Sequence, residues 1–165
     1  LTVDRIVLGY GLCSNGIVGV KAEAHPIYIP KAHDCIPLLL GTLASYNKIA
    51  KEEPGTYYLT RGWIESEGAP LDSLARYKTR LTDDVAEWGR REEYKNYKRI
   101  RWVDTNVDFE GKFKKIAREN ADFLELEFVE AKGDMEMMRD AIANTAPADW
   151  LIIKPGSVVD SAMYY

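Results

Sequence analysis

Both cysteines of this chain and one of its two histidines lie in two short segments whose residue types suit metal or thiol chemistry. The first segment is Gly9-Tyr10-Gly11-Leu12-Cys13-Ser14-Asn15-Gly16, and the second is His33-Asp34-Cys35. Thiolate and imidazole are ligands that zinc prefers, and a set of two cysteines and one histidine leaves a fourth position open, as in a catalytic zinc site. We therefore predict that Cys13, His33 and Cys35 bind zinc or another transition metal.

Plainer interpretations of these residues stay open. Two cysteines and a histidine fall within chance for 165 residues, and the paired CxxC spacing of strong zinc motifs is absent. In one such interpretation, the two cysteines are small hydrophobic residues that pack in the core. In another they form a disulfide, which is less compatible with a reducing compartment. Gly9, Gly11 and Gly16 do not fit the GxGxxG dinucleotide pattern. Gly11, Asn15 and Gly16 are still candidate ligand-binding residues because they share the turn of Cys13.

The elements that must position these residues alternate along the chain. Strand-like runs are expected at Arg5–Leu8, Pro26–Ile29, Thr56–Leu59, Ile100–Val103, Leu124–Val129 and Trp150–Ile153. Segments with helical spacing separate them, which predicts an α/β fold: a mainly parallel sheet of about five or six strands with helices on both faces, in a Rossmann-like three-layer arrangement. Sites in such folds lie past the carboxyl ends of strands, where both cysteines are expected.

Helices are expected on either side of these strand ends. The clearest runs over Cys35–Lys51 with Asp34 as its N-cap, and 17–23 is a helical segment after Cys13. A position in the first turn predicts that Cys35 has a lowered pKa, because the helix dipole favours a thiolate there. The long charged stretch 71–98 should be helical with a break near Thr82 or Gly89, and further helices are expected around Phe113 and Met138.

Polar residues at other strand ends are further candidates. Thr60 and Arg61 follow the strand at Thr56–Leu59, and Arg61 is either a ligand for a carboxylate or phosphate or a structural residue. Asp104 follows the strand at Ile100–Val103, where it orients His33 or caps the next helix. We include all three with the candidate ligand-binding residues.

Composition narrows the class of protein. A net charge of −4 and a pI near 5.3 argue against nucleic acid as the main partner, and no apolar run reaches the roughly 20 residues of a membrane span. Two cysteines without a disulfide framework fit the cytoplasm. We expect one α/β domain over residues 1–165, and because the chain begins at Leu1, almost directly before a strand, we expect that its true beginning is missing.

Four motifs resemble the uncharacterised family called domain of unknown function 1638. They are Ile6-Val7-Leu8-Gly9-Tyr10-Gly11-Leu12-Cys13; Ala32-His33-Asp34-Cys35-Ile36 with Leu38-Leu39-Leu40-Gly41; Glu53-Pro54-Gly55-Thr56-Tyr57-Tyr58-Leu59-Thr60 with Trp63; and Tyr94-Lys95-Asn96-Tyr97. The resemblance implies a longer N-terminus, with a further strand, helix and cysteine before Leu1, and this cysteine would be a fourth ligand. It also implies that the protein occurs in anaerobic bacteria and methanogenic archaea, where it is often encoded near corrinoid proteins and their methyltransferases.

These expectations combine into one functional hypothesis with two alternatives. The hypothesis is a cytoplasmic metal-binding protein of anaerobic one-carbon or corrinoid-linked metabolism, either a zinc-dependent methyltransferase-like enzyme or an accessory to one, with a corrinoid protein or methyltransferase as partner. One alternative is a non-enzymatic module that binds a small molecule or cofactor in the same crevice. The other is an interaction subunit of a larger complex, which exposed tryptophans among Trp63, Trp88 and Trp102 would favour.

Overall fold

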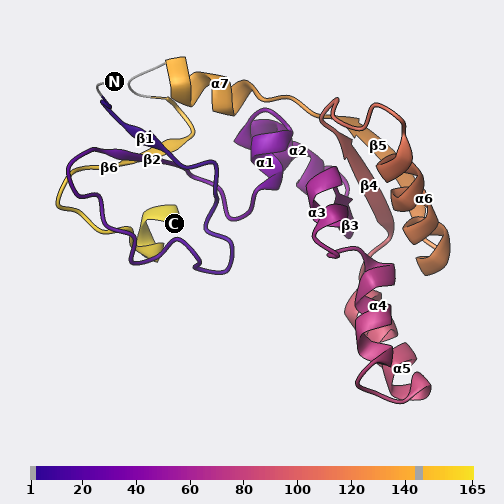
Figure 1. Ribbon diagram of the computed structural model, residues 1–165. Helices are drawn as coiled ribbons and strands as arrows, with labels where there is room; N and C mark the ends of the chain where they lie inside the picture. The colour runs from indigo at the N-terminus through magenta and orange to yellow at the C-terminus, as the bar shows by residue number, and fades with distance from the viewer. Residues whose placement is uncertain (1–2, 144–146) are drawn as a thin grey trace. The chain divides into compact units, whose positions relative to one another are not determined.

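The computed structural model describes residues 3–143 and 147–165, which form two compact units. Unit 1 consists of Leu1–Asn47 and Asp134–Tyr165, and unit 2 is the continuous segment Lys48–Gly133 between them. Each unit has its own three-stranded sheet. Figure 1 shows the elements of both units.

The sheet of unit 1 has β2 at its centre. It contains β1 (Ile6–Val7), β2 (Ile27–Pro30) and β6 (Trp150–Ile153), and these three strands lie side by side in Figure 1. β1 is parallel to β2, whereas β6 is antiparallel to it. All four residues of β2 are buried, so this strand has the continuous apolar sequence of a central strand.

Both faces of this sheet carry a hydrophobic core. Ile27 and Ile29 point into one cluster, and Tyr28, between them, points into the other, as the two-residue period of a strand requires. Helix α7 (Glu136–Ala143) supplies Met137 and Ala141 to the cluster of Tyr28. The short 3-10 helix η1 (Ser161–Tyr164) supplies Tyr164 to the cluster of Ile27.

The helix expected over Cys35–Lys51 is in fact two helices. α1 (Ile36–Leu39) ends before Gly41, whose φ of +94° is left-handed, and α2 (Leu43–Glu52) begins after it. The Thr42 hydroxyl accepts a hydrogen bond from the Ser45 amide at 3.0 Å, which is an N-cap for α2. The helical spacing of the apolar residues therefore continues across Gly41 and Thr42, although the helix itself is interrupted there.

The sheet of unit 2 is all parallel, in the order β3 (Thr56–Leu59), β4 (Arg99–Asp104) and β5 (Glu127–Lys132). Between β3 and β4 lie α3 (Arg61–Glu65), α4 (Pro70–Lys78) and α5 (Asp83–Tyr94), and α6 (Lys112–Leu124) connects β4 with β5. The break between α4 and α5 includes Thr82, one of the two positions expected from the sequence.

The two faces of β4 differ in chemistry. Ile100 and Trp102 are buried in the core with Ala117 and Ala121 of α6. On the opposite face, Arg101 is 8% exposed and forms an ion pair with Glu53, while the neighbouring Arg99 pairs with Glu53 at 3.3 Å and with Glu127 at 3.1 Å. A charged network thus occupies positions that apolar side chains fill on the other face.

The mixed α/β character and five of the six expected strand positions agree with the sequence analysis, whereas β5 begins three residues later than expected because Leu124 ends α6. One expectation about the sheet is wrong. The six strands form two sheets of three instead of one sheet of five or six, and β6 is antiparallel. The expected helix at 17–23 is also wrong: 13–19 form a turn, and Gly19 has a φ of +88°. No helix in the described residues has the length and apolar character needed to cross a membrane.

Candidate functional site

The two cysteine-bearing loops of unit 1 are joined by backbone hydrogen bonds. The Leu12 amide donates to the Ala32 carbonyl at 2.8 Å, and the Cys13 amide donates to the His33 carbonyl at 2.9 Å. These bonds continue the parallel pairing of β1 and β2 past the ends of both strands. Both segments follow strands, as expected, and the two strands are neighbours in the sheet.

Gly11 makes this close approach possible. A Cβ built on Gly11 would lie 2.7 Å from the carbonyl oxygen of Asp34 and 2.9 Å from that of Ala32. Contacts this short do not occur for real side chains, so the backbones could not stay paired with any larger residue. Gly11 has a structural role at the point where the loops meet.

The turn that carries Cys13 has an unusual backbone. Cys13, Ser14 and Asn15 have φ values of 43°, 56° and 69°, all in the left-handed region that side chains other than glycine disfavour. Gly16 follows, and a Cβ on it would lie 2.9 Å from the Tyr10 hydroxyl. Strained backbone of this kind persists only where the surrounding structure holds it in place, and it is found most often at functional sites.

Cys13 is a partly buried free thiol. Burial raises its pKa above the ordinary cysteine value, and a hydrogen bond from the Tyr10 side chain opposes that rise. The thiol form of Cys13 is thereby favoured in the absence of a bound ion. A cation at this position would reverse that preference, because a metal stabilises the thiolate.

Cys35 does not have the lowered pKa expected from the sequence. It is the N-cap of α1, which has only four residues and so gives little dipole. Cys35 is exposed as a residue, but partial desolvation of its sulfur, followed by the negative charge of Asp34 and then the influence of Cys13, raises the pKa of the thiol. Asp34 is fixed beside it, since one of its carboxylate oxygens accepts the Ile36 amide at 2.8 Å.

His33 is exposed and directs its ring towards the C-terminal tyrosines. The ring centroids lie 6.4 Å from Tyr164 and 5.3 Å from Tyr165. Among the residues described, no three His, Cys, Asp or Glu side chains are arranged to hold a metal ion. The structure thus brings the loops of Cys13, His33 and Cys35 together without gathering their side chains into a complete ligand set.

Thr60 and Arg61 belong to unit 2, where both have local partners. The Thr60 hydroxyl accepts the Trp63 amide at 3.1 Å and caps α3. The Arg61 guanidinium pairs with Glu65 at 3.0 Å and donates to the Val107 carbonyl at 2.7 Å. These contacts support the structural interpretation of Arg61.

Asp104 also lies in unit 2, at the end of β4, whereas His33 lies in unit 1. Its carboxylate accepts the amide of Asn106 at 2.8 Å, and Asn106 has a left-handed φ of 58°. Asp104 therefore stabilises the turn after β4. The expectation that Asp104 caps the next helix is wrong, because α6 begins only at Lys112 and its N-cap is Gly111.

Two groups of residues around the cysteines were missed by the sequence analysis. Tyr164 and Tyr165 contact His33 from the far end of the chain, and no local spacing could indicate that contact. The Tyr46 hydroxyl donates to the second carboxylate oxygen of Asp34 at 3.4 Å. A continuous helix over Cys35–Lys51 would place Asp34 and Tyr46 about 18 Å apart. The break between α1 and α2 therefore makes this bond possible, and the expected single helix could not have indicated it.

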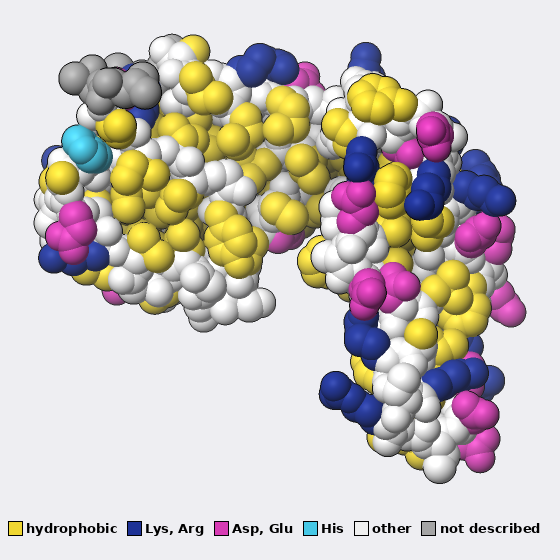
Figure 2. Space-filling view, viewed as in Figure 1, with side chains coloured by type: hydrophobic (Ala, Val, Ile, Leu, Met, Phe, Trp, Pro, Cys, Tyr) yellow, Lys and Arg dark blue, Asp and Glu magenta, His cyan; other side chains and the backbone are white. Residues whose placement is uncertain are grey.

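The surface of unit 2 has exposed aromatic residues among mixed charges. Trp63 and Trp88 are exposed and Phe109 is 91% exposed, whereas Trp102 is buried. Figure 2 shows acidic and basic side chains interspersed over α4 and α5. Arg90 pairs with Glu87 at 3.0 Å in this region. Four basic side chains between residues 90 and 101 each form an ion pair with a nearby carboxylate, namely Arg90, Lys95, Arg99 and Arg101.

Comparison with known proteins gives one match. A family model described as "Protein of unknown function (DUF1638)" matches residues 1–142. The match includes all of unit 2 and the loops of both cysteines, and it ends before β6 and η1. No curated protein and no solved structure matches the chain.

Proposed function

The chain belongs to the DUF1638 family, whose function is unknown, and from its own residues we propose that unit 1 binds a transition-metal ion, zinc in the first instance, through the thiolates of Cys13 and Cys35. The observation that carries the proposal is the hydrogen bond from the Cys13 amide to the His33 carbonyl. It fixes the two thiol-bearing loops side by side at the carboxyl ends of parallel strands.

The fit of the ion to the described geometry is partial. Two thiols are available in adjacent loops, but His33 packs against tyrosine rings and the described residues hold no complete ligand set. We therefore propose that Cys13 and Cys35 supply two ligands to the ion. A reoriented His33 side chain or a substrate thiol would occupy the remaining coordination positions.

The cellular role that we propose follows the resemblance described above. A site that holds thiolates suits the transfer of methyl groups to or from thiols, and we place the protein in one-carbon or corrinoid-linked metabolism of the cytoplasm. It acts there as a methyltransferase-like enzyme or as an accessory to one. Its two free cysteines are compatible with a reducing compartment.

Metal analysis of protein purified without oxygen tests this proposal. After zinc loading and removal of excess ion, the wild type should hold close to one equivalent, and Cys13→Ser and Cys35→Ser should each hold almost none. His25→Ala is the matched control and should bind like the wild type, since His25 lies at the opposite end of β2 from the cysteine loops. His33→Ala decides whether the imidazole is a ligand.

The result that would overturn the proposal is a wild type without stoichiometric metal, or a Cys13→Ser variant that retains it. Circular dichroism of each variant separates loss of the ion from loss of the fold. A wild type that binds no ion would leave a non-enzymatic small-ligand module as the better hypothesis.

A further inference from the structure

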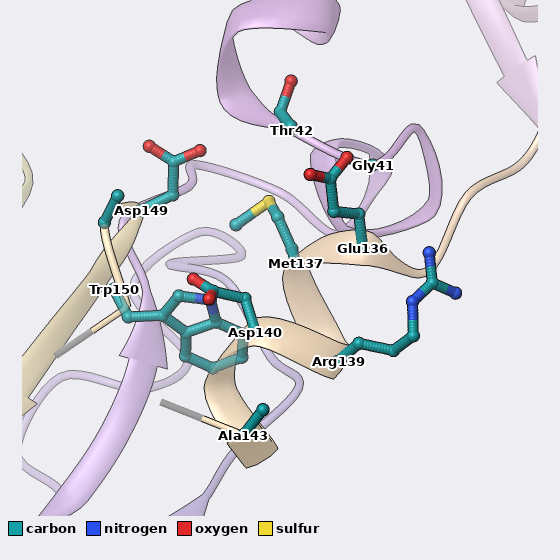
Figure 3. Close-up of a pocket in the computed structure, with 10 residues that line it drawn as sticks. Gly41, Thr42, Glu136, Met137, Arg139, Asp140, Ala143, Asp149 and Trp150 are labelled. Carbon is teal, nitrogen blue, oxygen red and sulfur yellow. The ribbon is translucent and has the colours of Figure 1, made fainter. Parts of the chain in front are cut away.

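Unit 1 contains a second site-like feature, a pocket of about 410 Å³ (Figure 3). This volume is within the range of small-molecule sites, roughly 300–1,000 Å³. The pocket lies between the start of α2, the helix α7 and the start of β6. Its lining residues are Gly41, Thr42, Glu136, Met137, Arg139, Asp140, Ala143, Ala148, Asp149 and Trp150. Neither cysteine is among these described residues, so the pocket is distinct from the proposed metal site.

Trp150 is the residue that points to a ligand. Its side chain is buried, with the residue only 7% exposed, and its indole Nε1 has no hydrogen-bond partner among the described residues. A buried indole N–H usually finds an acceptor, because leaving it unpaired costs its full desolvation. Figure 3 shows this nitrogen on the edge of the ring that faces α7 and Asp140.

The charges around the pocket favour a cation. Three carboxylates line it, from Glu136, Asp140 and Asp149, and Arg139 is the one basic side chain in the described lining. Arg139 already forms an ion pair at 2.6 Å with Asp134, which does not line the pocket. The lining residues thus carry a net negative charge, while Met137 and the ring of Trp150 supply apolar surface.

We propose that this pocket binds a small organic ammonium ion that also carries a hydrogen-bond acceptor. The ammonium group pairs with the carboxylates of Glu136 and Asp140, and the acceptor takes the hydrogen bond of the Trp150 indole N–H. The short carbon chain between the two groups packs against Met137. Amino ethers and amino alcohols have this combination of groups.

Two amines of nearly equal size test the proposal, namely 2-methoxyethylamine and butylamine, which differ by an ether oxygen in place of a CH₂. Their dissociation constants are measured by ligand-observed NMR titration at pH 7, where both are protonated. The wild type should bind the ether about fivefold more tightly, which is the effect of one hydrogen bond. Trp150→Phe keeps the ring and removes the N–H, so this preference should disappear.

Further variants separate the two contacts. The double variant Glu136→Gln/Asp140→Asn should bind both amines at least tenfold more weakly and keep the preference for the ether. Trp88→Phe and Glu23→Gln, at exposed positions outside the pocket, should leave both affinities unchanged. No binding of either amine, equal binding of the two by the wild type, or a preference that persists in Trp150→Phe would each overturn the proposal.

Discussion

The backbone amide of Cys13 donates a hydrogen bond to the carbonyl oxygen of His33, with 2.9 Å between nitrogen and oxygen. This bond lies beyond the assigned ends of β1 and β2, so it belongs to the loops and not to the strands. It is the contact on which the proposed thiol site depends. Changes that separate these two backbones should therefore affect both stability and metal binding.

Gly11→Ala is the most direct such change. The new Cβ would lie 2.7 Å from the Asp34 carbonyl oxygen, so the loops must move apart. We expect the free energy of unfolding to fall by about 2 kcal/mol, in the range of overpacking substitutions. Gly62→Ala in α3 is the control, because its Cβ would meet open space and alanine favours a helix. Urea unfolding followed by circular dichroism measures both, and an unaffected Gly11→Ala would contradict the close approach.

Ser14→Gly should stabilise the protein. Ser14 has a φ of 56° in the middle of three left-handed residues, a conformation that glycine adopts without steric cost. We expect a gain of roughly 0.5–1 kcal/mol after the greater flexibility of glycine in the unfolded chain is subtracted. The same exchange at Ser45, inside α2, should instead destabilise, since glycine is a poor helix former. Equal effects at both positions would argue against the left-handed turn.

The Cys35 thiol should be slow to alkylate at neutral pH. Loss of solvent and the charge of Asp34 raise its pKa above the ordinary value of 9.0, so the reactive thiolate forms only at higher pH. We expect the rate of alkylation by iodoacetamide, measured by peptide mass spectrometry in metal-free protein, to rise with pH with a midpoint above pH 9. Asp34→Asn removes the charge and should lower this midpoint. A midpoint below 9 in the wild type would contradict the described surroundings of the sulfur.

The ion pair of Glu53 with Arg101 should matter more for stability than that of Glu127 with Arg99. Glu53→Ala leaves the largely buried Arg101 without its carboxylate, and removal of one partner from a buried pair typically costs about 3 kcal/mol. Glu127 is well exposed, so Glu127→Ala should cost under about 1 kcal/mol. Chemical denaturation of the two variants checks this order. Equal losses would show that burial of Arg101 has no energetic consequence.

Local sequence patterns located the strands but could not determine how they pair. Thr56–Leu59 and Trp150–Ile153 are strands at the residues expected, because apolar runs report burial directly. Ile27 pairs with Ile6 on its parallel side and with Ile153, more than a hundred positions along the chain, on its antiparallel side. No periodicity within one run contains this information.

The break at Gly41 and the position of Asp104 illustrate the same limit at the site. Gly41-Thr42 carried a readable signal, a left-handed glycine followed by a capping threonine, but the apolar period across it was given more weight. Asp104 was assigned to the same sheet edge as His33 on the assumption of a single sheet. Once the strands divide between two sheets, that assumption no longer supports a shared site.

The insertion of Lys48–Gly133 into unit 1 has a consequence for the order in which the chain folds. During synthesis, β1 and β2 leave the ribosome long before β6, whose pairing with β2 closes a loop that contains all of unit 2. A folded unit 2 shortens that loop and lowers the entropy lost when it closes. Unit 2 is a continuous segment with its own core, so it should complete its contacts first, and β2 gains its antiparallel neighbour β6 only after all of unit 2 has been synthesised.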